Sequence, residues 1–258
     1  MGDWFNALPE WGLALAAVLL LIGAAEVGVI IARRHKPGPE GADRFLFTLA
    51  APTIGLLGMM IGFTFLMVLT HYQTRVAEVM EAANTIEKAA LRARMLPEPY
   101  RSAVTPLLKE YATLRVAHRG AEVASSAMME ANRRAIEIQE KLSDEAAAAA
   151  VSNPHVVPTG LFIEALNDVI DTYERRLQAV RHKVPTPIFL TLEAIAMVAI
   201  GFSAYGAQWG SAYTRWPMWV MAALIGVVIA LIIDLDRPRG GFITVSQQPL
   251  LDVIERMK

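Results

Sequence analysis

The stretch FLFTLAAPTIGLLGMMIGFTFLMVLTHYQTR, residues 45–75, indicates both a membrane span and the element that follows it. Residues 45–69 carry no charged side chain, and this length is enough for a helix to cross the hydrocarbon core of a bilayer. Residues 70–74 contain neither proline nor glycine, so nothing in them should end a helix before Arg75. The sequence therefore predicts a membrane helix that continues directly into an extramembrane helix.

Three further apolar runs have the length of membrane spans, at residues 11–32, 187–206 and 216–233. The chain has 258 residues, of which 54% are hydrophobic, and this share is high because the apolar residues form such runs. Backbone polar groups find no water in lipid, so each run must be a helix. We expect an all-α integral membrane protein with four spans. The first run is too long for a signal-peptide core, and MGDWFNALPE before it has no Lys or Arg.

Between the second and third spans lie about 110 polar residues with helical periodicity. Predicted helices cover residues 75–95, 100–118, 121–151 and 159–183, and they are expected to form a bundle continuous with the membrane helices. The expected organisation is a transmembrane hairpin at 1–70, a helical domain at 71–183, a second hairpin at 184–236 and a tail at 237–258.

The distribution of basic residues predicts the orientation. The loop after the first span holds Arg33, Arg34, Lys36 and Arg44, whereas Asp3 and Glu10 are the charged residues before that span. The positive-inside rule places this loop in the cytoplasm, and the N-terminus, the helical domain and the tail outside. The basic residues of the tail favour the opposite orientation. We expect the first arrangement.

Two acidic residues interrupt the spans, Glu26 and Glu193. An ionisable side chain at a helix centre costs roughly 2.5–3.5 kcal/mol on insertion scales, so it usually faces protein or water. Both are candidates for a pore-lining or ion-coordinating carboxylate. The alternative is a carboxyl group hydrogen-bonded to a neighbouring helix.

The second span contains GMMIG at residues 58–62, a motif that lets helices approach closely. Gly58 and Gly62 either pack inside one subunit or line a pore or subunit interface. Thr53 and Thr64 could offer hydroxyl groups to the same pathway.

The fourth span ends in a dense group of charges, Asp234, Asp236, Arg237 and Arg239, followed by two glycines. Proline and glycine here predict a fixed turn at the membrane rim. The aspartates could pair with Arg237, Arg239 or Arg175 and clasp the fourth span to the helical domain. The alternative is a vestibule that attracts ions.

In the helical domain, Glu81, Asn84 and Lys88 share one helix face, as do Asn167, Asp171 and Arg175 on another helix. The asparagines within these charged faces predict a buried polar interface between the two helices. The alternatives are a solvated charge ladder and a ligand site.

Several classes of function have no support in the sequence. The five histidines have no metal-ligand spacing, no nucleotide or hydrolase motif occurs, and no cofactor is expected. A net charge of −1 offers no field for nucleic acid. We therefore do not expect an enzyme.

Three segments resemble the signature blocks of the bestrophin-like bacterial membrane proteins: EAANTIEKAALRARMLPEPYR (81–101), ALNDVIDTYERR (165–176) and DLDRPRGGFITVSQQPLLDV (234–253). The residues that carry the resemblance are Glu81, Asn84, Arg94, Leu96, Pro97, Asn167, Asp168, Arg175, Asp234, Asp236, Arg237, Pro238, Gly240, Gln247, Pro249 and Leu250.

The resemblance implies an oligomeric anion channel with four membrane helices per subunit, a pentamer by analogy, and a helical domain in the cytoplasm. Phe63 is then a candidate for the hydrophobic neck of the pore. Ionised Glu26 and Glu193 in a pore would instead favour cations. The expected function is passive conduction of small inorganic ions by a homo-oligomer in the bacterial inner membrane, with the sign of the ion open. The alternative is a non-conducting scaffold or sensor whose helical domain binds a partner or envelope component.

Overall fold

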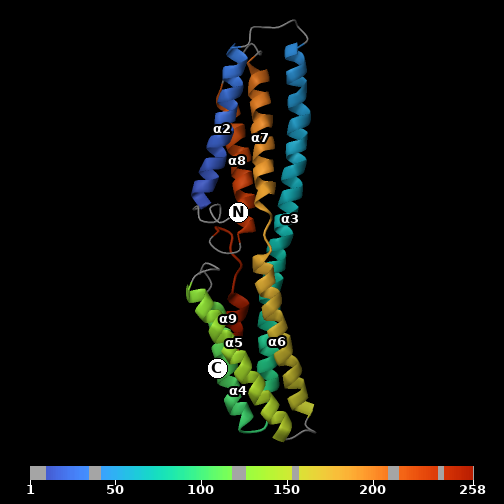
Figure 1. Ribbon diagram of the computed structural model, residues 1–258, viewed down its shortest axis with the longest axis vertical. Helices are drawn as coiled ribbons and strands as arrows, with labels where there is room; N and C mark the ends of the chain where they lie inside the picture. The colour runs from blue at the N-terminus through green and yellow to red at the C-terminus, as the bar shows by residue number, and fades with distance from the viewer. Residues whose placement is uncertain are drawn as a thin grey trace. The chain divides into compact units, whose positions relative to one another are not determined.

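The computed structural model describes residues 10–34, 42–117, 126–152, 157–208, 215–237 and 241–257, and within them the only regular elements are eight helices (Figure 1). They are α2 (Glu10–Arg34), α3 (Ala42–Ala93), α4 (Tyr100–Ala117), α5 (Ser126–Ser152), α6 (Val157–Arg181), α7 (Thr186–Ala207), α8 (Trp216–Asp236) and α9 (Gln248–Arg256). The expected all-α fold class is confirmed, and α2, α3, α7 and α8 are each long and apolar enough to cross a membrane.

Helix α3 is continuous over 52 residues, as the absence of a breaker at residues 70–74 predicts. Pro52 lies inside it and removes one backbone donor. The neighbouring Thr53 hydroxyl donates to the carbonyl oxygen of Leu49 at 2.7 Å, which supplies a hydrogen bond in the same turn. The bond that Pro52 cannot make would run to the Thr48 carbonyl, so the Thr53 contact adds to this turn without replacing it.

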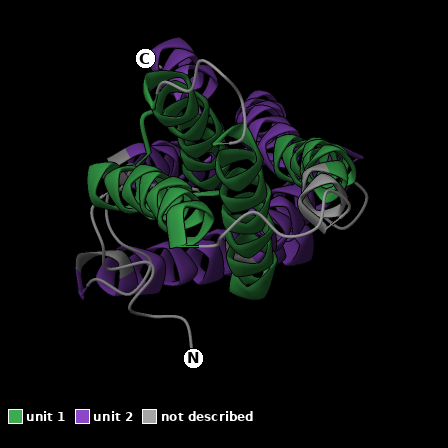
Figure 2. Ribbon diagram, turned by 90° about the horizontal axis from the view of Figure 1, so that it is seen from above, with its two compact units in different colours: residues 1–70, 183–237, 241–243 green, residues 71–182, 238–240, 244–258 purple. Residues whose placement is uncertain are grey.

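The chain divides into two compact units, coloured separately in Figure 2. The membrane unit comprises residues 1–70, 183–237 and 241–243. Within it, α2 packs directly on α7 and α8, because glycines remove the side chains where these helices cross. A Cβ on Gly28 would lie 2.3 Å from the carbonyl oxygen of Gly201, and one on Gly226 would lie 2.7 Å from Val18 Cγ2. Small residues at helix contacts are the usual means of packing in lipid.

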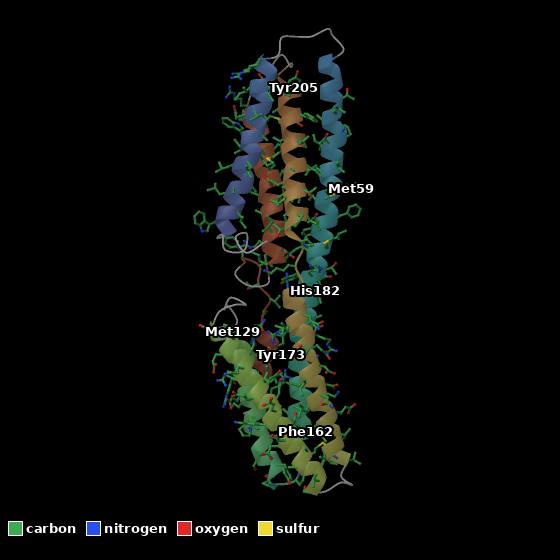
Figure 3. The ribbon with its side chains drawn as sticks, in the orientation of Figure 1. Met59, Met129, Phe162, Tyr173, His182 and Tyr205 are labelled. Atoms are coloured by element: carbon green, nitrogen blue, oxygen red, sulfur yellow. The ribbon has the colours of Figure 1, made fainter. Side chains whose placement is uncertain are left out.

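The helical unit comprises residues 71–182, 238–240 and 244–258. Its core is a set of buried apolar residues at helical spacing on α3 to α6. Helix α3 contributes Ala82, Ala83, Ile86 and Ala89; α4 contributes Val104 and Leu108; α5 contributes Ile138 and Leu142; α6 contributes Phe162 and Val169. Phe162 is fully buried, and Figure 3 marks its place on α6.

The C-terminal segment differs from the expected tail. Residues 248–256 form α9, which buries Leu250 and Val253 in the core of the helical unit. Arg256 on the same helix pairs with Glu87 of α3 at 2.7 Å. Helix α9 is therefore part of the helical unit, because its apolar residues at positions i and i+3 complete that core.

Candidate ion pathway and rim site

The residues proposed for a pathway on α3 divide between two faces of that helix. Thr64 is 2% exposed and lies on the buried stripe of Ala50, Leu57 and Val68. In contrast, a Cβ added to Gly58 or Gly62 would meet no atom within 4 Å. Packing of these glycines within the chain, one of the two expectations, is therefore not observed among the described residues. The motif lies on an uncovered face.

Phe63, the candidate for a hydrophobic neck, is 62% exposed. Its neighbours Met59 and Leu66 are also exposed, so the uncovered part of α3 is apolar on both sides of the glycines. Figure 3 marks Met59 on this helix. The sequence correctly placed these residues in one membrane span. It did not show which of their side chains are exposed.

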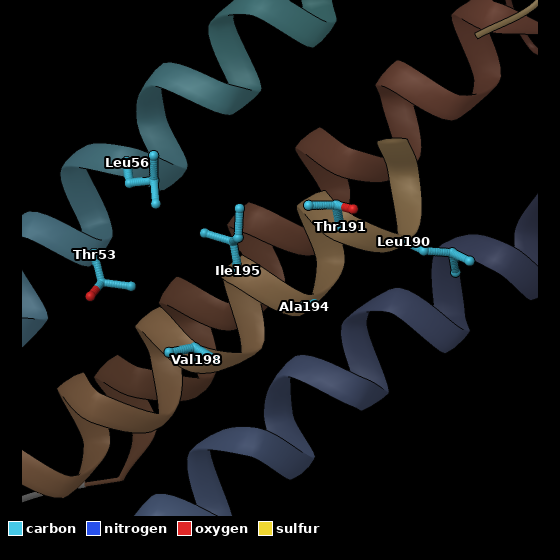
Figure 4. Close-up of a pocket in the computed structure, with 7 residues that line it drawn as sticks. All are labelled: Thr53, Leu56, Leu190, Thr191, Ala194, Ile195 and Val198. Carbon is cyan, nitrogen blue, oxygen red and sulfur yellow. The ribbon is translucent and has the colours of Figure 1, made fainter. Parts of the chain in front are cut away.

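A cavity of about 460 Å³ separates α3 from α7 within the membrane unit (Figure 4). Thr53 and Leu56 line it from α3, and Thr191, Ile195 and Val198 are among the residues that line it from α7. The Thr53 side chain thus faces this cavity, while its hydroxyl hydrogen is directed at Leu49. Contact between α3 and α7 is looser here than the contacts of α2 at its glycine crossings.

Glu26 of α2 has specific partners at the start of α8. Its carboxylate pairs with the Arg215 guanidinium at 3.2 Å and accepts a hydrogen bond from Trp219 Nε1 at 2.9 Å. A charge that is paired and hydrogen-bonded costs much less to place in a membrane than a lone one. This geometry supports the expected alternative of a carboxyl group bonded to a neighbouring helix. The sequence marked Glu26, but not Arg215 or Trp219 as its partners.

Glu193 of α7 has a different environment. It is half-buried, and its Oε1 atom is buried without a hydrogen-bond partner among the described residues. Helices α2 and α7 run in the same direction in Figure 1 and meet at Gly28 and Gly201. Glu193 therefore lies roughly 9 Å of helix rise from the level of Glu26. The two carboxylates belong to separate sites.

The aspartates that end the fourth span bind backbone amides. Asp234 is buried, and its two oxygens accept hydrogen bonds from the N–H groups of Phe242 and Ile243 at 2.9 and 3.0 Å. Gly241 permits this approach, since a Cβ there would lie 2.9 Å from Asp234 Oδ1. Asp236 accepts from the N–H of Val184, at 3.2 and 3.3 Å to its two oxygens.

We expected Asp234 and Asp236 to pair with arginines and join the fourth span to the helical domain, and that pairing stays a prediction. The amide bonds show an additional role, because they fix the segments that follow α8 and precede α7. Their bonds allow α8 to continue to Asp236, three residues beyond the predicted span. Arg237 follows as its C-cap, and Arg239 lies outside the described residues.

The proposed polar interface in the helical unit is not buried within the chain. Glu81, Asn84, Asn167 and Asp171 are all exposed. Arg175 donates to the Thr172 hydroxyl at 2.9 Å and lies 3.9 Å from Glu78, instead of pairing with Asp171. The expectation of a buried interface is therefore incorrect for the single chain.

Ion pairs do join α3 and α6, at two residues that the sequence marked, Lys88 and Asp168, and at Arg92 and Glu164, which it did not mark. Lys88 pairs with Asp168 at 2.7 Å, and Arg92 pairs with Glu164 at 2.8 Å. The register between the two helices decides which charges meet, and the apolar core sets that register. Within the described residues, no group of three or more His, Asp or Glu side chains could hold a metal ion.

These features define an all-α membrane protein with four candidate spans and a helical unit that shares α3 with them. The family model for the Bestrophin-like domain matches residues 18–250, and the chain belongs to this family. A comparison with curated proteins gives no match.

Two solved structures with similar folds are single-substitution variants of a bacterial bestrophin homologue from Klebsiella pneumoniae. One has a TM-score of 0.66 at 13% identity, and the other has a TM-score of 0.64 at 12% identity. Each comparison covers 95% of this chain and 97% of the other chain. At this identity the likeness establishes the fold.

Proposed function

We propose that this chain is a subunit of a homo-oligomeric ion channel in the bacterial inner membrane, with the conducting path built around α3. The observation that carries this proposal is the uncovered face of α3. Gly55, Gly58 and Gly62 face open space, whereas Gly28 and Gly226 sit in close helix crossings.

Glycines on an exposed helix face suggest a role other than contact with lipid, because glycine offers little surface to acyl chains. It allows close approach of another helix backbone, or it widens a path at the axis of an assembly. The family relation to bestrophins supports the second use. Phe63, at its 62% exposure, is our candidate for an apolar constriction of that path.

Glu193 is the carboxylate that we assign to the ion path. Glu26 is already engaged by Arg215 and Trp219, whereas Glu193 Oε1 has no partner among the described residues. A carboxylate beside a path favours cations, while the resemblance to bestrophins implies anions. Measured selectivity decides between these two signs.

The test is ion flux from liposomes that contain the purified protein, with sodium, potassium and chloride gradients imposed separately. We expect a selective flux that changes in magnitude or selectivity in Glu193→Gln. Glu145→Gln on α5 of the helical unit is the matched control and should conduct as the wild type does. Absence of flux for all three ions across several voltages would overturn the channel proposal and favour a non-conducting scaffold. Unchanged flux in Glu193→Gln would remove that residue from the path.

A further inference from the structure

Arg115 of α4 is held by aromatic rings in the helical unit. Its guanidinium carbon lies 4.8 Å from the ring centroid of Tyr111 and 3.9 Å from that of Tyr173. Tyr173 is on α6, where Figure 3 marks it. Guanidinium groups stack well on aromatic faces because their charge is delocalised and weakly hydrated. The two rings thus fix the position of the charge without neutralising it.

The polar contacts of Arg115 leave two donors unused. Its Nη1 atom donates to Asn132 Oδ1 at 3.5 Å, which is a long contact. Its Nε and Nη2 atoms are buried and have no hydrogen-bond partner among the described residues. In the same part of the chain, no carboxylate oxygen lies within ion-pair distance of it. A buried charged donor without an acceptor is costly, so this site requires an acceptor from elsewhere.

A small cavity lies next to these donors, enclosed by α3, α4 and α6. Arg115, Arg176, Tyr111 and Tyr173 line it together with small and apolar side chains, and no Asp or Glu is among its lining residues. The cavity volume is about 10 Å³, which is enough for one small molecule or ion.

The remaining polar groups of the cavity also favour an acceptor as occupant. The Tyr111 hydroxyl oxygen accepts a hydrogen bond from Gln139 Nε2 at 3.2 Å, which leaves its own hydrogen to donate. The Thr85 hydroxyl hydrogen is already used within α3, where the carbonyl oxygens of Glu81 and Ala82 accept it, so Thr85 supplies no donor to the cavity. Arg176 Nη2 is fixed by Gln247 Oε1 at 2.5 Å. The donors of the cavity are therefore those of Arg115 and the Tyr111 hydroxyl, with the charge of Arg176 also at its lining.

We propose that this cavity binds a monatomic anion of the size of chloride, held by Arg115 between Tyr111 and Tyr173. The site is in the helical unit, and the proposal does not depend on conduction through the membrane unit. Occupancy would join α3, α4 and α6 through one shared ligand. Because a ligand of the folded state alone stabilises that state, chloride should raise the thermal stability of the protein.

The test compares thermal unfolding of the purified full-length protein in sodium chloride and sodium gluconate at equal ionic strength, followed by circular dichroism. We expect the wild-type midpoint to rise with chloride and to reach a plateau, with bromide acting in the same way, whereas sulfate should give only the gradual rise without a plateau that surface exclusion produces. Arg115→Gln should unfold at the same midpoint in chloride and gluconate. Arg134→Gln is the matched control, because Arg134 pairs with Glu110 and Glu137 outside the cavity, and it should keep the full response to chloride.

The Arg115→Lys variant distinguishes specific binding of chloride in the cavity from a general effect of positive charge. It keeps the charge but loses the planar group with its fixed donors, and should need at least tenfold more chloride for half of the shift. It also provides the decisive comparison if Arg115→Gln does not fold. Equal wild-type midpoints in the two salts would mean that the cavity holds water only and would overturn the proposal. A wild-type response to chloride in either Arg115 variant would also overturn it.

Discussion

Asp234 shows how a single side chain organises the end of a membrane helix. Its carboxylate receives two backbone N–H groups, from residues eight and nine positions further along the chain. The sequence shows an acidic residue at the end of an apolar run, which is enough to mark it. It does not show that the partners are amides instead of arginines, because amides are present at every residue. The same holds for Glu26, whose partner Arg215 is 189 residues away.

Replacement of Asp234 by Asn should destabilise the membrane unit. The amide offers one acceptor oxygen in place of two, so one part-buried N–H of residues 242–243 loses its partner. Hydrogen bonds to charged groups contribute about 1.5–3 kcal/mol each, and we expect a loss of this order. Denaturant unfolding in detergent measures it, with Asp252→Asn on α9 as the control. Equal losses for the two variants would contradict a special role of Asp234.

Individual glycines, more than the glycine motif, hold the membrane helices together. The GMMIG motif of α3 is readily noticed, yet its glycines meet nothing within 4 Å in the chain. Gly28, Gly201 and Gly226 belong to no motif that the sequence analysis selected, and they form the close crossings of α2. Two helices that cross need a small residue only at the point of contact, so no repeated motif is required. The sequence alone does not show which helices meet at such a glycine.

Gly28→Ala should therefore weaken the packing of α2. The added methyl group would lie 2.3 Å from the Gly201 carbonyl oxygen and 3.1 Å from its carbon, which are backbone atoms that cannot rotate away. Overpacking of this kind typically costs about 1–3 kcal/mol. Gly23→Ala on the same helix is the control, because its Cβ would meet no atom within 4 Å. Thermal stability in detergent should fall for Gly28→Ala alone, and a similar fall in both would contradict the crossing.

The start of α4 carries a carboxylate whose contribution depends on pH. Hydrogen bonds from Ser102, followed by that from Arg101, hold the pKa of Glu98 below its ordinary value. Because the pKa of Glu98 is lower in the folded protein than in the unfolded chain, its ionised form stabilises the fold at pH values above 4.5. This stabilisation is lost as the pH falls through the pKa of the folded protein. Because Glu98 is exposed, the effect should be small. Glu98→Gln should lower the midpoint of thermal unfolding at pH 7, and this difference from the wild type should shrink as the pH is lowered below 4.5.

At the scale of the whole molecule, apolar periodicity predicts most of the architecture. The continuity of α3 follows from the lack of a breaker, and the four candidate spans follow from length and composition. Helix α9 was missed because nine residues are too few for a clear periodic signal, and it is ordered by burial of Leu250 and Val253. The stack of Arg115 between Tyr111 and Tyr173 had no local signal, since its members come from distant parts of the chain.

The charge pattern predicts that the helical unit is outside the cytoplasm, and the absence of native cysteine makes a direct test possible. Single cysteines at Ser152, exposed in the helical unit, and at Arg34, exposed at the end of α2, would be treated with a membrane-impermeant maleimide. We expect labelling of Ser152→Cys in intact spheroplasts and of Arg34→Cys only after lysis. The reverse pattern would place the helical unit in the cytoplasm, as the resemblance to bestrophins implies.

The pairing of Glu26 with Arg215 has a consequence for biosynthesis. Translation adds roughly 5–20 residues per second, so the 189 residues between them take about 10–40 s to appear. During that interval the first hydrophobic segment is in the bilayer, or in the insertion machinery, before Arg215 is available to pair with Glu26. The nascent chain must keep that acid away from the acyl chains until its last helices arrive. Completion of the membrane unit is therefore a late event, set by the emergence of α7 and α8 from the ribosome.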